Sequence, residues 1–120
     1  MFQSRYILVV DRYENTRRVL ERALTAAGYD VLLAPDWPVG ISLCHRRPVK
    51  LVLGDLPSPG QNLHVLKSFK DAFPQVPVVL MGEADRDELN EVAQLYRVQA
   101  VLPKPIQLAD LTRTVANALS

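Results

Sequence analysis

The sequence predicts an α/β fold in which five parallel strands alternate with five helices. Five short, apolar, β-branched runs are separated by longer segments that have helical periodicity. The runs do not alternate between apolar and polar residues, which is typical of parallel strands that are buried on both faces. The chain has 120 residues, of which 48% are hydrophobic. That size suits one core, so we expect residues 1–120 to form a single domain.

The predicted strands are the five apolar runs, and each is three to five residues long. They are Tyr6–Val10, Val31–Ala34, Leu51–Leu53, Val78–Met81 and Ala100–Leu102. Strands that alternate with helices connect through right-handed crossovers, so we expect one parallel sheet with helices on both faces.

The first predicted helix spans Asn15–Ala27, where apolar residues recur at spacings of three and four, and Gly28 follows as its C-terminal cap. The second, Val39–Arg46, has the weakest pattern because Pro38 and Gly40 interrupt it, although proline is accepted in a first turn.

The last three helices show clearer apolar periodicity. The third runs from Leu63 to Phe73 and is ended by Pro74. The fourth is indicated by Leu89 to Tyr96, and the fifth by Leu108 to Leu119.

Composition excludes several classes of protein. A net charge of +1 argues against a module dominated by nucleic-acid phosphate contacts. The single Cys44 excludes an internal disulfide or a multi-thiolate metal site and fits a reducing compartment. No apolar run is long enough to span a membrane, and the first residues do not resemble a signal peptide. We therefore expect a cytoplasmic protein without direct membrane or nucleic-acid contact.

The residues that follow the predicted strands are candidates for a functional site, because α/β sheets bind at the carboxyl ends of their strands. Two carboxylates, Asp11 and Asp55, and one ammonium, Lys104, should converge at this edge. A simpler interpretation is that the two Asp residues cap the helices that follow. Lys104 lies between two prolines, which is unusual for a surface lysine.

Other site chemistries find little support. The first strand is not followed by a glycine-rich phosphate loop, and no Gly-x-Ser-x-Gly elbow occurs. His45 and His64 fall on predicted helices away from the strand ends, so we expect surface or packing roles for both. Cys44 has no CxxC partner, and we expect no redox role.

Several motifs together resemble the response-regulator receiver domain of two-component signalling. The resemblance implies a flavodoxin-like (βα)5 doubly wound sheet with strand order 2-1-3-4-5. The motifs are ILVVD at 7–11, RRVLERALTAAGYDV at 17–31, LVLGDLPSPG at 51–60, PVVLMGEAD at 77–85 and LPKP at 102–105.

The resemblance assigns a role to each strand-end residue. It implies that a histidine kinase phosphorylates Asp55, giving an acyl phosphate. Asp11, Asp55 and the backbone carbonyl of Pro57 would hold Mg²⁺, which offsets phosphoryl charge. Lys104 would contact the phosphoryl group, and the resemblance implies a cis bond between Lys104 and Pro105.

The sequence departs from the family at several of these positions. Arg12 replaces the second metal-binding acid, and an arginine cannot coordinate Mg²⁺. Gly82 replaces the Ser or Thr that bonds the phosphoryl group, and Glu83 replaces a small residue. Val101 replaces the aromatic switch residue of the fifth strand.

Three further departures lie outside the phosphate contacts. Arg97 and Val98 replace a Gly-Ala pair before the fifth strand, Gly54 replaces a bulky apolar residue, and Ser58 replaces a methionine.

Two functional hypotheses follow. In the first, the chain is a pseudo-receiver in which Arg12 pairs with Asp55 or Asp11, so that phosphorylation and Mg²⁺ binding are weak or absent. Two such charges attract by about 4 kcal/mol at ~4 Å and an effective dielectric of ~20, before desolvation is subtracted. In the second, Asp55 is still phosphorylated with Mg²⁺ and controls a transcriptional or other output domain. We favour the first, because phosphoryl chemistry depends on positioning and charge stabilisation.

The expected partners are a histidine kinase or phosphotransfer protein, and an output domain or regulatory partner protein; a homodimer stays open.

We expect a signalling domain rather than an enzyme. A flavodoxin-like flavin enzyme is disfavoured because residues 11–16 are not hydroxyl-rich. Arginines near the first helix could form a basic stripe, but Glu14 and Glu21 dilute it. Trp37 and Tyr96 are expected to pack in or against the core rather than to anchor a partner.

Overall fold

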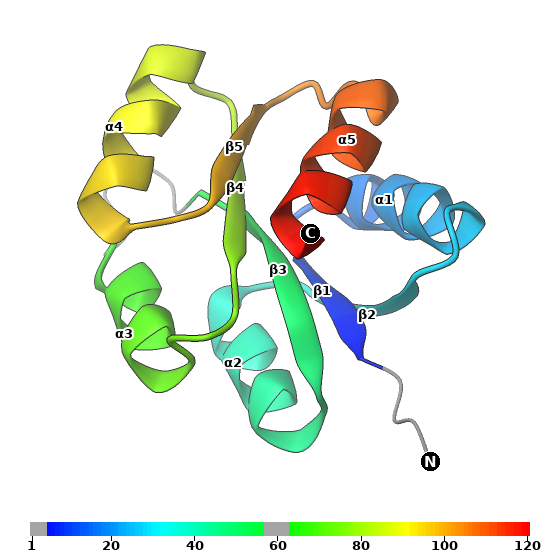
Figure 1. Ribbon diagram of the computed structural model, residues 1–120, viewed down its shortest axis with the longest axis horizontal. Coiled ribbons are helices and arrows are strands. Elements are labelled where there is room, and N and C mark those ends of the chain that lie inside the picture. The colour runs from blue at the N-terminus through cyan, green and yellow to red at the C-terminus, as the bar shows by residue number, and fades with distance from the viewer. Residues whose placement is uncertain (1–4, 57–62) are drawn as a thin grey trace.

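The computed structural model of the chain describes residues 5–56 and 63–120. Within these residues, strands and helices alternate from β1 to α5, and the strands form one parallel sheet in the order β2-β1-β3-β4-β5. Figure 1 shows the sheet between two layers of helices. The predicted α/β class and strand order are confirmed.

The strands lie close to the predicted apolar runs. They are β1 (Tyr6–Val10), β2 (Asp30–Ala34), β3 (Val49–Asp55), β4 (Val78–Gly82) and β5 (Ala100–Pro103). The central strand, β3, extends beyond the predicted Leu51–Leu53 because it pairs with β1 on one side and β4 on the other. As a result Asp55 is the last residue of the strand rather than part of the loop.

The helices cover both faces of the sheet. They are α1 (Glu14–Ala26), α2 (Trp37–Arg46), α3 (His64–Ala72), α4 (Arg86–Tyr96) and α5 (Leu108–Leu119). In Figure 1, α1 and α5 lie on one face and α2, α3 and α4 on the other. Successive strand residues point to opposite faces, so Ile7 and Val9 join one buried cluster while Leu8 and Val10 join the other.

Helix boundaries follow local capping chemistry. Pro38 lies in the first turn of α2, as expected, but the helix begins earlier, at Trp37, because the Asp36 side chain accepts a 2.9 Å bond from the Val39 amide. Gly28 has φ +94° just after α1, which confirms its predicted place at the helix end.

Helix α4 ends differently from α1. Its C-terminal cap is Arg97, which has the left-handed conformation φ 56°, ψ 43°. This is the position at which the family resemblance led us to expect a glycine, so the backbone requirement is retained although the residue is not.

Two further observations complete the fold. The Lys104–Pro105 peptide bond is cis, as the resemblance implied. Among the described helices, none combines the length and the apolar character that crossing a membrane would require.

Candidate functional site

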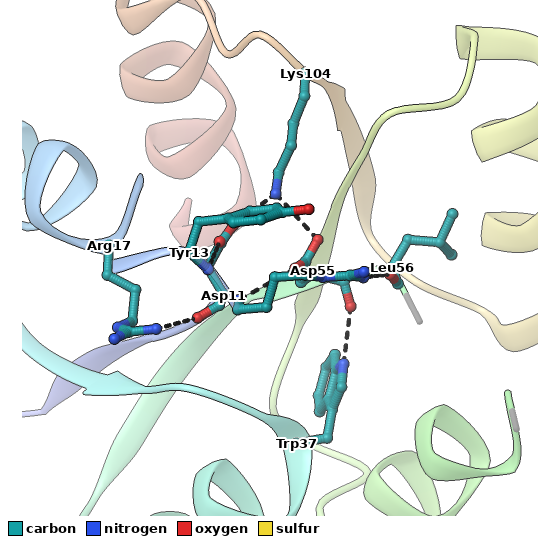
Figure 2. A network of polar contacts seen from close by, with 8 residues as sticks. Asp11, Tyr13, Arg17, Trp37, Asp55, Leu56 and Lys104 are labelled. Carbon is teal, nitrogen blue, oxygen red and sulfur yellow. Dashed lines mark hydrogen bonds and ion pairs between the residues drawn. The ribbon is translucent and has the colours of Figure 1, made fainter. Parts of the chain in front are cut away.

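The candidate site is a crevice at the carboxyl ends of β1, β3 and β5. Strands β1 and β3 are neighbours and Val10 is in register with Gly54, so the residues that follow them, Asp11 and Asp55, lie side by side. Lys104 follows β5, and its backbone amide is tied to the Gly82 carbonyl by a 2.7 Å bond. The sheet therefore brings together the two carboxylates and the ammonium predicted from the sequence (Figure 2).

The Lys104 ammonium joins both carboxylates. Its Nζ lies 2.8 Å from Asp11 Oδ2 and 3.2 Å from Asp55 Oδ1. Asp11 is fully buried and Asp55 is 7% exposed, so these charges interact with little solvent screening. The contact with Asp11 Oδ2 is a close ion pair without hydrogen-bond alignment, since this oxygen has no aligned donor among the described residues.

Burial and charge act in opposite directions on Lys104. Burial alone would lower the pKa of its ammonium, because desolvation disfavours the charged form. The close contact with Asp11 and the negative charges of Asp55 and Asp11 outweigh this effect, so the pKa of Lys104 is raised. The lysine is therefore held as a cation between the two acids.

Arg12 contacts the other carboxylate oxygen of Asp55, Oδ2. Its Nε donates a 2.9 Å hydrogen bond to Asp55 Oδ2, its backbone amide lies 3.3 Å from the same oxygen, and its Nη2 donates to the Leu56 carbonyl at 2.9 Å. The hydrogen bond between the Arg12 and Asp55 side chains raises the pKa of the guanidinium. Of the two partners considered for Arg12, the structure therefore shows Asp55.

Asp11 is also bonded on its other oxygen. Asp11 Oδ1 accepts a 2.8 Å hydrogen bond from the Tyr13 amide, and the Arg17 Nη1 donates to the Asp11 carbonyl at 2.6 Å. The Tyr13 amide belongs to the residue just before α1, so Asp11 shapes the entry to this helix as well as lining the crevice.

The Tyr13 ring covers the crevice, a role that the sequence analysis missed. The ring centre lies 5.2 Å from Lys104 Nζ and 5.8 Å from Arg12 Cζ, within range of cation–π attraction. Figure 2 shows the ring beside the tip of Lys104. Tyr13 follows Arg12 in the sequence, but only the folded chain brings its half-exposed ring next to both cations.

Trp37 supports the crevice from the opposite side (Figure 2). It is 6% exposed, and its Nε1 donates a 2.9 Å hydrogen bond to the Asp55 carbonyl. A Cβ on Gly54 would lie 2.2 Å from the indole Cζ2. The expected packing role of Trp37 is confirmed, and the indole explains why Gly54 stands where the family has a bulky residue.

The two predicted switch positions lie in packed surroundings. A Cβ on Gly82 would come within 3.1 Å of Leu56 Cβ and of Leu89 Cδ2, so these side chains leave little room there for the larger Ser or Thr. Val101 is 6% exposed within the buried cluster under α3 and α4. Glu83 is exposed, and its side chain makes no hydrogen bond or ion pair with another described residue. Pro57 and Ser58 lie outside the described residues.

The remaining candidates lie away from the crevice. The His45 ring packs 4.9 Å from the Phe73 ring, in keeping with its expected packing role, and His64 is an exposed residue at the start of α3. Cys44 is half-buried, and burial raises the pKa of its thiol to about 11. A thiol of this kind is a poor nucleophile near neutral pH.

The carboxylates of the crevice are already engaged by groups of the protein itself. Each oxygen of Asp11 and Asp55 already contacts a donor or a cation, and the two carboxylates are balanced by Arg12 and Lys104. Within residues 5–56 and 63–120, no group of three or more His, Cys, Asp or Glu side chains is arranged to hold a metal ion. A further ion of charge +2 would lie beside two cations without a free carboxylate.

Comparison with known proteins defines the family of this chain. The family model of the response regulator receiver domain matches residues 7–116, and the chain belongs to that family. It is 30% identical over 115 residues to the DNA-binding transcriptional regulator NtrC of Klebsiella pneumoniae, covering 93% of this chain and 24% of that protein. It is also 36% identical over 85 residues to the response regulator PleD of Caulobacter vibrioides, covering 68% of this chain and 19% of that protein. The chain thus spans about a quarter or less of these relatives.

Solved structures show the same fold. The chemotaxis protein CheY4 of Vibrio cholerae superimposes with a TM-score of 0.86 at 18% identity, over 98% of this chain and all of that one. The receiver domain of NtrX from Brucella abortus superimposes with a TM-score of 0.85 at 25% identity, over 94% of this chain and 97% of that one. The protein is therefore a receiver domain of the signalling type with the flavodoxin-like fold.

Proposed function

We propose that this receiver domain works as a pseudo-receiver, in which Arg12 takes the place of the metal ion and phosphorylation of Asp55 is weak or absent. The contact between Arg12 Nε and Asp55 Oδ2, at 2.9 Å, is the observation that carries the proposal. Arg12 replaces a metal-binding acid of the family and at the same time supplies the positive charge that a metal would bring.

The state of Asp55 supports the proposal. To act as a nucleophile, its carboxylate must present an oxygen lone pair to phosphorus. The Arg12 Nε and backbone amide both engage Oδ2, so attack from this oxygen requires one of these contacts to open, and Lys104 engages Oδ1 as well. A bound Mg²⁺ would ordinarily offset the charge of the phosphoryl group. In this structure the Arg12 guanidinium instead donates hydrogen bonds to Asp55 and to the Leu56 carbonyl.

A second function has an observation of its own. The acceptor Asp55, the acid Asp11 and the lysine Lys104 are all present in the crevice, and Asp11 Oδ2 lacks an aligned hydrogen-bond donor among the described residues. If Arg12 swings outward, these three groups could support Mg²⁺-dependent phosphorylation of Asp55. In that case Asp55 would switch an output domain.

Intact mass spectrometry after incubation with acetyl phosphate and Mg²⁺ separates the two functions. We expect no stoichiometric adduct on the natural chain and an adduct on Arg12→Asp. Mg²⁺ titration followed by Trp37 fluorescence gives a second readout, because the indole Nε1 contacts the Asp55 carbonyl. We expect Arg12→Asp to bind Mg²⁺ more tightly than the natural chain.

The matched control is Arg18→Asp, which makes the same charge change on the exposed face of α1, where Arg18 pairs with Glu14. It should resemble the natural chain in both assays. A stoichiometric phosphoryl or beryllofluoride adduct on Asp55 of the natural chain, or submillimolar Mg²⁺ binding to it, would overturn the pseudo-receiver proposal.

The proposed partners follow the family. NtrC is a DNA-binding transcriptional regulator, and this chain matches about a quarter of it. We propose that the domain works in a cytoplasmic two-component pathway, downstream of a histidine kinase or phosphotransfer protein and upstream of an output domain or regulatory protein. The face formed by α4, β5 and α5 is the proposed contact surface, either for that partner or for a second copy.

A further inference from the structure

Residues of α3 and of the C-terminal end of α4 line a second concave site. In Figure 1 these two helices lie on the face of the sheet opposite α1 and α5. It measures about 650 Å³, which is in the range of small-molecule sites. We call it the α3–α4 cleft, and define it by His64, Lys67, Lys70, Tyr96 and Arg97. It shares no residue with the crevice at Asp55, so its role does not depend on the function proposed there.

The charge of the α3–α4 cleft is mainly positive. Lys67, Lys70 and Arg97 line it, and Asp71 is the acid among its lining residues. Lys67 reaches Asp71 at 3.7 Å, but both side chains are more than two-thirds exposed, so this pair is weak. Lys70 and Arg97 therefore face the cleft as two further cations, while the charge of Asp71 is paired with Lys67.

Lys70 is the most informative of these cations. It is half-buried on α3, and within the described residues its ammonium makes no ion pair or hydrogen bond. Burial without a partner lowers the pKa of Lys70. A half-buried ammonium without a counter-charge is unfavourable, and an anion bound in the cleft would remove that cost.

Arg97 brings a second cation to the other wall. It holds the left-handed backbone conformation that glycine adopts more readily, and its guanidinium likewise makes no ion pair or hydrogen bond with a described residue. The side chain thus adds positive charge to the cleft at a position where a glycine would close α4 with less strain.

The remaining wall is apolar and aromatic. Tyr96 is half-buried beside the cleft, Leu95 is 73% exposed at its edge, and Pro74 contributes from the segment after α3. Such surfaces suit the ring or hydrocarbon part of a ligand whose charged group meets the lysines.

We propose that the α3–α4 cleft binds a small organic anion, with a phosphate or polyphosphate group at Lys70 and Arg97 and a ring against Tyr96. Phosphates accept several hydrogen bonds from Lys and Arg and suit cations on two walls. The concave shape and ligand-sized volume favour a small molecule over an acidic surface of a partner protein, which would need a flatter and longer contact.

Titration with ATP, pyrophosphate and adenosine, followed by amide NMR shifts, tests the proposal. We expect ATP and pyrophosphate to give saturable shifts at His64, Lys70, Tyr96 and Arg97, with ATP binding more tightly, and adenosine alone to give none. Lys70→Gln should weaken ATP binding on the order of tenfold, because one charge-assisted contact is lost.

The matched control is Arg86→Gln, which removes a cation from the exposed N-terminal end of α4, away from the cleft. It should leave ATP binding unchanged. The proposal is overturned if no anion gives saturable shifts, if the shifts are confined to Tyr13 and Lys104, or if Lys70→Gln and Arg86→Gln weaken binding equally. Binding of a polyglutamate peptide without binding of ATP or pyrophosphate would also overturn it, and would indicate a protein contact.

Discussion

Asp55 is held by residues from three separate elements. Arg12 comes from the turn after β1, Lys104 from the segment after β5, and Trp37 from the first residue of α2. The first two engage the carboxylate and the third engages the backbone carbonyl. A change at any one of them therefore alters the setting of Asp55 without altering the residue itself.

Gly54 and Trp37 should be energetically coupled. Gly54→Ala places a Cβ 2.2 Å from the indole, so the ring must shift and the bond from Nε1 to the Asp55 carbonyl is weakened. We expect a loss of about 1–3 kcal/mol of unfolding free energy, measured by urea denaturation with far-ultraviolet circular dichroism.

The double variant Trp37→Leu/Gly54→Ala tests the cause of that loss. If the indole is what Gly54 accommodates, the alanine should cost less than half as much in the Trp37→Leu background. Additive costs would contradict the coupling.

Cys44 should react slowly in the native protein. With a thiol pKa of about 11, only about one thiol in a thousand is ionised at pH 8, against roughly a quarter for an ordinary cysteine. We expect iodoacetamide to alkylate it at least ~100-fold more slowly than free cysteine at pH 8, with the rate rising about tenfold per pH unit up to pH ~10. Alkylation in denaturant at the rate of a free thiol is the control, and an equal rate without denaturant would refute this prediction.

At the scale of the elements, helix ends set much of the local geometry. Asp36 and Asp85 cap α2 and α4 with side-chain bonds to Val39 and Glu88, each at 2.9 Å. The turn after α1 is closed by a glycine, and the turn after α4 by Arg97. The two C-terminal ends of α1 and α4 therefore meet the same conformational demand with different residues.

Arg97→Gly should stabilise the protein. A left-handed residue other than glycine costs about 1–2 kcal/mol, which the glycine would relieve. Glycine also has more freedom in the unfolded chain, and this lowers the stability by about 0.5–1 kcal/mol. We expect a net increase of roughly 0.5–1 kcal/mol in unfolding free energy, measured by urea denaturation. Arg97→Ala removes the same charge but keeps the strain, so it should give no gain; equal stability of the two variants would contradict the argument.

At the scale of the whole molecule, charge is balanced both globally and at the crevice. The chain carries 14 basic and 13 acidic side chains, and the crevice pairs Arg12 and Lys104 with Asp11 and Asp55. Since Asp11 is fully buried and pairs with Lys104, removal of this lysine leaves a carboxylate that water cannot solvate.

The stability that Lys104 contributes should depend on pH in a defined direction. Its pKa is raised in the folded state, so the native protein binds this proton more tightly than the unfolded chain does. The contribution is complete below the ordinary lysine value of about 10.4 and is lost as pH rises through the raised pKa. At pH 7 we expect Lys104→Met to cost about 3–5 kcal/mol, because it breaks a buried ion pair.

The measurement is the difference in unfolding free energy between the natural chain and Lys104→Met, taken from pH 7 to pH 11. The difference should be constant up to about pH 10 and then shrink. Lys67→Met, on the exposed face of α3, is the control and should show only a small difference throughout. A difference that grew with rising pH would contradict the sign of the shift.

Local patterns in the sequence were sufficient for much of the fold. Unbroken apolar runs gave the parallel strands, Gly28 marked the end of α1, and the strand ends gathered Asp11, Asp55 and Lys104. These features rest on residue types and spacings that act over a few positions. The length of β3 was underestimated because Lys50 and Gly54 are not typical strand residues, and its pairing on both sides overrides that preference.

The sequence by itself determined the fold class, the strand order through the family resemblance, and the set of charged groups at the sheet edge. Only the tertiary structure decided that Arg12 pairs with Asp55 rather than Asp11, that Tyr13 covers the crevice, and that Trp37 fills the space above Gly54. The physical reason is that the positions of strands and helices follow from local periodicity and crossover handedness, whereas each of these contacts depends on side-chain torsions and on where a distant element packs.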